Sequence, residues 1–120
     1  MPRDYKAYLS DIIGAVNKIE RYTNNLSFQD FLQNELVQDG VARNLEIIGE
    51  AVKKVPDHIK RQKPDIEWKK IAGLRDILIH DYFGIDVVIV WDIIKNKIPV
   101  LKKNILNLYT IISSDISSDD

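Results

Sequence analysis

Hydrophobic residues recur along this chain at steps of three and four, the spacing that places them on one face of a helix. The clearest stripe lies near the C-terminal end and predicts one long helix with Asp86 as a candidate N-cap. Pro99 falls inside this stripe and predicts a kink or a local break, because proline lacks the amide proton of the helical ladder. The stripe comprises Val87, Trp91, Ile94, Ile98, Leu101, Ile105, Leu108 and Ile112.

Two further helices are predicted in the N-terminal third. The same spacing predicts a long helix over residues 4–22, which the polar residues 23–25 end. Ser27 is a candidate cap for the next, short helix, with Asp30 in its first turn, where the helix dipole favours an acid. Its apolar residues are expected to face inward: Phe28, Phe31 and Leu32.

The middle of the chain predicts two more helices around a polar connection. One stripe runs from Val41 to Val55 and stops at Pro56, with a break from the preceding segment expected near residues 39 and 40. The polar stretch between Pro56 and Asp65 predicts a short helical turn with loops. A fourth helix is then expected from about Glu67 to about His80.

Short connections between these helices favour antiparallel neighbours, so the expected fold is all-α. It is an up-and-down bundle of four main helices plus a short helix. Residues 1–112 form the predicted helical domain, and residues 113–120 form a polar tail that is expected to fray.

Composition and charge exclude several classes of protein. The 120 residues, 45% of them hydrophobic and 29% charged, suit one globular domain and include no apolar run long enough to span a bilayer. No secretory signal precedes the first helix, so the cytoplasm is the expected location. The chain has no cysteine, which excludes disulfides and thiolate zinc sites. A net charge of −1 disfavours tight binding to long duplexes, but it allows a small RNA-cleaving site.

A group of basic residues in mid-chain could supply local cations for such a site. A solvated basic surface beside helix ends explains the same group equally well. The group comprises Lys53, Lys54, Lys60, Arg61, Lys63, Lys69 and Lys70.

The two histidines have different surroundings. His58 lies in the polar connection and is expected to be an ordinary surface residue, whereas His80 lies in the densest group of Arg, His, Asp and Tyr in the chain, at residues 73–83. Because a helix turns about 100° per residue, a straight helix holds Arg75 and His80 on different faces. They can meet if the chain turns after His80, or if a second subunit completes the site.

An arginine and a histidine are the minimum set for cutting RNA without a metal. Histidine can move the proton of the 2′-hydroxyl or of the leaving 5′-oxygen, and arginine can stabilise charge on the phosphoryl oxygens. Spacing alone favours the alternative, in which Arg75 pairs with Asp76 or a neighbouring Glu and His80 is a hydrogen-bonded residue at a helix end. A metal site is disfavoured, because His80, Asp76 and Asp81 are too few ligands.

A polar ridge on the third main helix is a candidate support for this site. Arg43, Glu46 and Glu50 share one side of the predicted helix, where they can form surface ion pairs of a few tenths of a kcal/mol each. A functional alternative is that Glu46 or Glu50 orients Arg75. Gly49, in mid-helix, suggests that another helix approaches closely there.

Beyond these patterns, the chain resembles a known family. Arg75, His80 and Tyr82 match the R-x-x-x-x-H-x-Y motif of HepT-like toxins in the HEPN superfamily. The agreement extends over residues 44–51, residues 68–82 and Trp91, and this extent makes the resemblance specific.

The resemblance implies a homodimeric, metal-independent ribonuclease toxin of a bacterial toxin–antitoxin system that needs no cofactor. Arg75 and His80 would be catalytic, with Asp76 and Asp81 as supporting residues. The antitoxin would be a minimal, MntA-like nucleotidyltransferase that AMPylates Tyr82, and the added negative charge would repel RNA. The alternatives are a non-catalytic HEPN module that binds a nucleotide or the nucleotidyltransferase, and a purely structural dimerisation domain.

Overall fold

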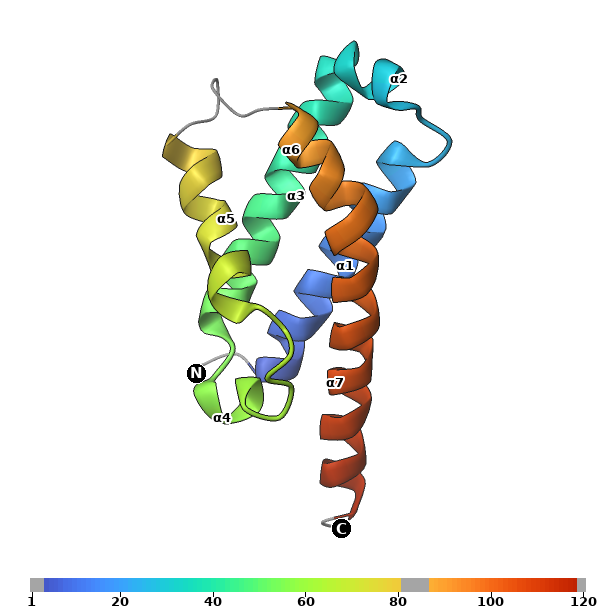
Figure 1. The fold of residues 1–120 in the computed structure, drawn as a ribbon. Coiled ribbons are helices and arrows are strands. Elements are labelled where there is room, and N and C mark those ends of the chain that lie inside the picture. The colour runs from blue at the N-terminus through green and yellow to red at the C-terminus, as the bar shows by residue number, and fades with distance from the viewer. Residues whose placement is uncertain (1–3, 81–86, 119–120) are drawn as a thin grey trace.

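Four main helices run alternately up and down (Figure 1), and they confirm the all-α bundle. The computed structural model describes residues 4–80 and 87–118, with side chains over residues 4–74 and 87–114, and these residues contain no strand. The main helices are α1 (Tyr5–Thr23), α3 (Glu35–Lys54), α5 (Trp68–His80) and α7 (Ile98–Ser118). The short elements are α2 (Phe28–Leu32), α4 (Asp57–Lys60), α6 (Val87–Asp92) and the π-helical turn η2 (Ile93–Lys97).

Both ends of α1 follow from local hydrogen bonding. The carboxylate of Asp4 caps the N-terminus by accepting from the Lys6 amide at 3.1 Å. At the other end the buried Thr23 hydroxyl donates to the carbonyl of Ile19 at 2.8 Å. Asn25 then takes a left-handed conformation with φ of 64°, which asparagine tolerates better than most residues and which turns the chain toward α2.

A capping box begins α2. The Ser27 hydroxyl accepts from the Asp30 amide, and the Asp30 carboxylate accepts from the Ser27 amide, each at 3.1 Å. Phe31 is buried and Phe28 is half-buried, as predicted, but the expectation that Leu32 faces inward is wrong. Leu32 is 44% exposed because it is the last residue of a five-residue helix whose buried side chain is Phe31.

The third helix is continuous where a break was expected. α3 passes through residues 39 and 40, so the prediction of a break there is wrong. Gly40 faces the ring of Tyr22 in α1, and an ideal Cβ on Gly40 would lie 3.2 Å from the Cδ2 and Cε2 atoms of that ring. This glycine therefore serves the close approach of α1 to α3 rather than a turn.

The long C-terminal helix contains the predicted seam and a change of helix type. Ile94, Ile98, Leu101, Ile105, Leu108 and Ile112 are buried, while Val87 and Trp91 are half-buried. The helix stays continuous at Pro99, because the preceding turn widens into the π-helical η2. α7 also runs to Ser118, so residues 113–118 are helical in the structure, and the fraying expected for residues 113–120 stays a prediction.

The core lies between α1, α3 and the C-terminal helix. α3 packs against α1 on one side and α5 on the other, and α7 packs against α1. An ion pair of 2.8 Å between Lys102 and Glu20 joins α7 to α1 at the rim of the core. Within the described ranges, no helix combines the length and the apolar character that crossing a bilayer requires.

Two glycine substitutions test the packing of α1 on α3. Gly14 is exposed in mid-α1 with open space around it, so Gly14→Ala should stabilise the fold by about 0.5 to 1 kcal/mol through helix propensity. Gly40→Ala has the same propensity gain but forces the Tyr22 ring to move, so we expect it to fall roughly 1 kcal/mol or more below Gly14→Ala. Urea denaturation measures both. Equal gains for the two variants would contradict the close approach.

Candidate functional site

The backbone of α5 carries the first part of the predicted motif. Arg75, Asp76 and His80 all belong to this helix, and His80 is its last residue as the structure describes it. Asp81 and Tyr82 lie outside the described residues. The convergence of the arginine and the imidazole therefore stays a prediction.

Contacts at the N-terminal end of α5 fix its direction. The Trp68 indole donates from Nε1 to the carbonyl of Lys63 at 3.1 Å, and the ammonium of Lys60 lies 6.0 Å from the centre of the Trp68 ring. Ile66, just before the helix, is buried. Together with the packing of α5 on α3, these contacts hold the base of the helix that bears Arg75 and His80.

A second aromatic cluster holds the chain where it resumes after the motif. The Trp91 ring lies 5.2 Å from the Phe31 ring and 6.0 Å from the Phe28 ring, centroid to centroid. The Lys95 ammonium lies 4.7 Å from the centre of the Trp91 ring, within cation–π range. α6 is thus anchored to α2.

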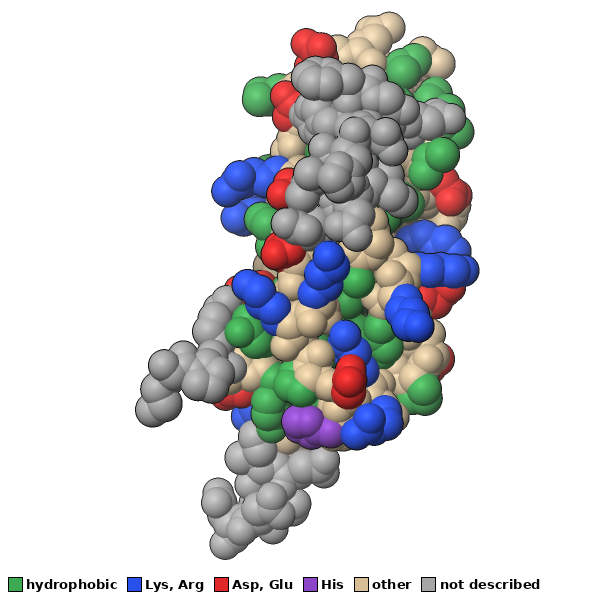
Figure 2. All heavy atoms as spheres, turned by 90° about the vertical axis from the view of Figure 1, so that its left-hand side faces the viewer, with side chains coloured by type: hydrophobic (Ala, Val, Ile, Leu, Met, Phe, Trp, Pro, Cys, Tyr) green, Lys and Arg blue, Asp and Glu red, His purple; other side chains and the backbone are tan. Residues whose placement is uncertain are grey.

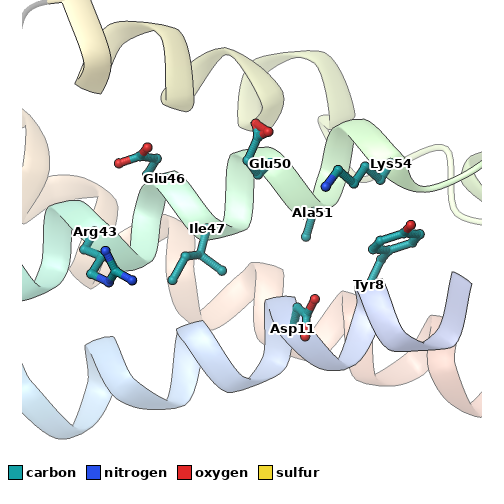
Figure 3. Close-up of a pocket in the computed structure, with 8 residues that line it drawn as sticks. All are labelled: Tyr8, Asp11, Arg43, Glu46, Ile47, Glu50, Ala51 and Lys54. Atoms are coloured by element: carbon teal, nitrogen blue, oxygen red, sulfur yellow. The ribbon is translucent and has the colours of Figure 1, made fainter. Parts of the chain in front are cut away.

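The predicted supporting residues line one pocket. Arg43, Glu46 and Glu50 share a cavity of about 280 Å³ between α1 and α3 (Figure 3). Glu46 and Glu50 extend from the side of α3 that faces α5, whereas Arg43 lies toward α1 (Figure 3). Both glutamates are half-buried and Arg43 is exposed. Helical spacing thus brings the three residues to one pocket, and the role of Glu46 or Glu50 in orienting Arg75 stays a prediction.

Sequence reasoning missed two polar members of this pocket, Tyr8 and Asp11, and named Lys54 only as one of the basic mid-chain group. Tyr8 and Asp11 rise from α1 toward α3, and Lys54 lies one turn beyond Glu50 (Figure 3). The spacing of Tyr8 and Asp11 marks a shared helical face, but only the register between α1 and α3 shows that this face meets Arg43. The lining carries three carboxylates and two cations, a mixture that suits the positioning of a charged side chain better than the binding of a polyanion. Among the described residues, no group of three His, Asp or Glu side chains could hold a metal ion.

The remaining candidates lie at the surface. His58 lies at the surface, as predicted, with its ring 6.2 Å from that of Tyr5. Lys and Arg side chains are spread with acids over the face that Figure 2 shows. Of the basic mid-chain group, Lys53, Lys54, Arg61, Lys69 and Lys70 are exposed, and Lys60 and Lys63 are half-buried.

A groove lies on the other side of α5, between α5 and the C-terminal helix. Its volume is about 330 Å³. On its rim Lys70 forms an ion pair of 2.8 Å with Glu67. The hydrogen bond from Lys70 and its charge hold the pKa of the Glu67 carboxyl below its ordinary value, with a smaller contribution from Lys97, and Glu67 raises the pKa of Lys70.

The comparisons with known proteins agree on one family. The family model described as Ribonuclease HepT-like matches residues 12–108. A probable ribonuclease HepT of Thermococcus cleftensis is 48% identical over 102 residues, which cover 85% of this chain and 93% of that protein. A candidate RNase of Methanocaldococcus jannaschii, MJ1216, is 46% identical over 101 residues, 84% of each chain. A search of solved structures finds no match.

The chain belongs to the HepT-like ribonuclease family of the HEPN superfamily. The match spans both main parts of the resemblance, the α3 segment and the α5 motif, and confirms it. It also confirms the prediction that the chain is a ribonuclease.

The pKa of Glu67 offers a test of the groove rim. We expect Lys70→Met to raise the pKa of Glu67 toward its ordinary value, and Lys69→Met, which removes a neighbouring exposed lysine, to leave it unchanged. Titration of the glutamate carboxyl carbons by NMR measures both. A pKa lowered in the folded state means that the carboxylate stabilises the fold above its unfolded pKa and that this contribution is lost as the pH falls through the folded pKa. An unchanged Glu67 pKa in Lys70→Met would show that the ion pair does not persist in solution.

Proposed function

We propose that this chain is a metal-independent endoribonuclease toxin that cleaves RNA through Arg75 and His80. The observation that carries the proposal is the family match over residues 12–108, which includes the whole R-x-x-x-x-H-x-Y motif. The toxin would act in a toxin–antitoxin system, with a minimal nucleotidyltransferase as its antitoxin.

The chemistry follows from the two side chains. The imidazole of His80 takes the proton of the 2′-hydroxyl or gives one to the leaving 5′-oxygen, and the guanidinium of Arg75 donates hydrogen bonds to the charged phosphoryl oxygens. One histidine cannot readily make both proton transfers at once. We therefore propose a homodimer that places two Arg–His pairs in one cleft.

The position of α5 supports this assignment. The helix is held at its base by Trp68 and packs along α3, and rigid elements hold catalytic groups better than loops do. Glu46 and Glu50 extend from the side of α3 that faces α5 (Figure 3). Carboxylates on that side suit the role of orienting the Arg75 guanidinium, with Asp76 and Asp81 as further supporting residues.

Removal of either catalytic side chain should stop cleavage. We expect purified protein to cut single-stranded RNA in EDTA, and Arg75→Ala and His80→Ala each to lower the rate by about 100-fold or more, the usual cost of losing a proton-transfer group or a transition-state donor. Gel analysis of a labelled RNA measures the rate. His58→Ala removes an exposed histidine and is the matched control, with helical circular dichroism unchanged in all variants.

Two results would contradict the mechanism. Cleavage retained by both Arg75→Ala and His80→Ala would remove these residues from the chemistry, and a monomer at micromolar concentration in sedimentation equilibrium would remove the composite cleft. If the chain forms a stable complex with the nucleotidyltransferase but neither cuts RNA nor arrests growth, it is a binding module.

Tyr82 should be the modified residue. Incubation with the nucleotidyltransferase and ATP is expected to add the mass of one or more AMP groups and to suppress RNA cleavage, because each phosphate adds negative charge where RNA must bind. Intact-mass spectrometry of wild type and Tyr82→Phe measures the label. Tyr109→Phe keeps Tyr82 and should label like wild type, so label retained in Tyr82→Phe would place the modification elsewhere.

A further inference from the structure

The groove between α5 and the C-terminal helix combines an apolar floor with a polar rim. Its volume of about 330 Å³ lies at the lower end of the range for small-molecule pockets, roughly 300 to 1,000 Å³. Apolar side chains from both helices line it: Ile71, Leu74, Ile93, Ile98, Val100 and Leu101. The polar side chains are Asp65, Glu67, Lys70, Asn96, Lys97 and Asn104.

An irregular turn of the helix forms one wall of the groove. Ile98 donates its amide to the carbonyl of Ile93, five residues back, and this bond closes the π-helical η2. Pro99 explains the widening, since its ring would clash with the carbonyl of Lys95 in a regular helix. π-helical turns are rare and frequently lie at functional sites. Three residues of this turn, Ile93, Asn96 and Lys97, line the groove.

The rim carries amide and ammonium groups that can recognise a planar polar ligand. Asn96 donates from Nδ2 to the carboxylate of Asp92 at 2.6 Å, which holds this amide in place. Asn104 is half-buried and lies eight residues after Asn96 on the same C-terminal helix. Lys97 and Lys70 both lie close enough to Glu67 to lower the pKa of that carboxyl, and the rim carries these two cations together with two acids, Asp65 and Glu67. Amides with cations above an apolar floor match a base with its attached phosphate.

The groove also lies beside the catalytic motif. Leu74 lines it, and α5 continues directly from Leu74 into Arg75, with a rise of about 1.5 Å per residue along a helix. A ligand in the groove is therefore within reach of an RNA chain whose phosphate is held by Arg75. A protein partner fits less well, because a stable interface buries about 800 Å² on each side, far more than so small a groove supplies.

We propose that this groove binds a nucleobase of the RNA substrate, next to the phosphate that is cleaved. The apolar floor contacts the face of the base, the amides of Asn96 and Asn104 contact its edge, and Lys97 contacts the adjoining phosphate. The groove would thus set which bases the enzyme prefers beside the cut. The inference rests on the proposed function for its biological role, while the binding itself can be tested without catalysis.

Mononucleotide binding tests the groove directly. Wild-type protein is titrated with each of the four nucleoside 3′-monophosphates, and ¹⁵N NMR follows the side-chain amides of Asn96 and Asn104. We expect saturable shifts at these amides that differ among the four bases, and binding on the order of tenfold weaker in Asn104→Ala, the scale of one lost base-edge contact. Asn107→Ala is the matched control, because Asn107 is exposed on the same helix and outside the groove.

A second variant guards against a folding artefact. Val100 is 57% exposed at the groove, so Val100→Trp can fill the groove with little change to the core and should abolish mononucleotide binding. Cleavage of an RNA pool with randomised sequence should show that Asn104→Ala and Val100→Trp alter the base preference at the cut, while Asn107→Ala keeps it.

The outcomes separate the two proposals. If the wild type cuts RNA but no mononucleotide shifts the groove amides, or if Asn104→Ala and Val100→Trp keep both binding and base preference, the groove proposal is overturned and the ribonuclease stands. Amide shifts that depend on protein concentration alone would assign the groove to a second copy of the chain and overturn it too. If mononucleotides bind as expected but the chain cuts no RNA, the groove proposal holds as a base-binding site and the proposed function falls.

Discussion

Two sides of α3 are buried at once, one against α1 and the other against α5, and the rest of the bundle depends on this packing. Burial of its apolar stripe contributes much of the hydrophobic free energy of the core. The same helix carries polar side chains beside these buried faces, with Glu46 and Glu50 on the side that faces α5 and Arg43 toward α1. The helix that supports the fold therefore also presents two carboxylates on the side that faces the motif helix.

Most of the fold could be predicted because apolar spacing reports directly on which face of each helix is buried. The seam from Ile94 to Ile112, the cap at Ser27 and the stop at Pro56 are all local signals. The wrong predictions concern residues whose surroundings are set by tertiary contacts. Gly40 predicts a break because glycine is a weak helix former, but the Tyr22 ring against it makes it a packing residue. Leu32 is exposed, and the sequence alone does not show which face of the short helix α2 is buried.

The candidate site also has members that the sequence predicts and members that only the tertiary structure shows. The motif residues and the ridge on α3 could be found from residue type and helical spacing, because each group lies on one segment. The membership of Tyr8 and Asp11 depends on how α1 is set against α3, and the wall formed by Asn96 and Lys97 depends on a turn that is not a regular helix. The proposed meeting of Arg75 with His80 would depend on the chain beyond α5 or on a second subunit, which no spacing within one helix can encode.

The π-helical turn before Pro99 also constrains how this gene can change in length. Loss of a single codon within residues 93–97 would remove the residue that widens this turn and leave Pro99 in a regular helical turn, where its ring would clash with the carbonyl four residues back. The helix would then have to bend or break between Trp91, which packs against Phe31, and the buried seam below it. Selection should therefore remove insertions and deletions within residues 93–97. It should tolerate them in the connection around α4, where the chain is largely exposed.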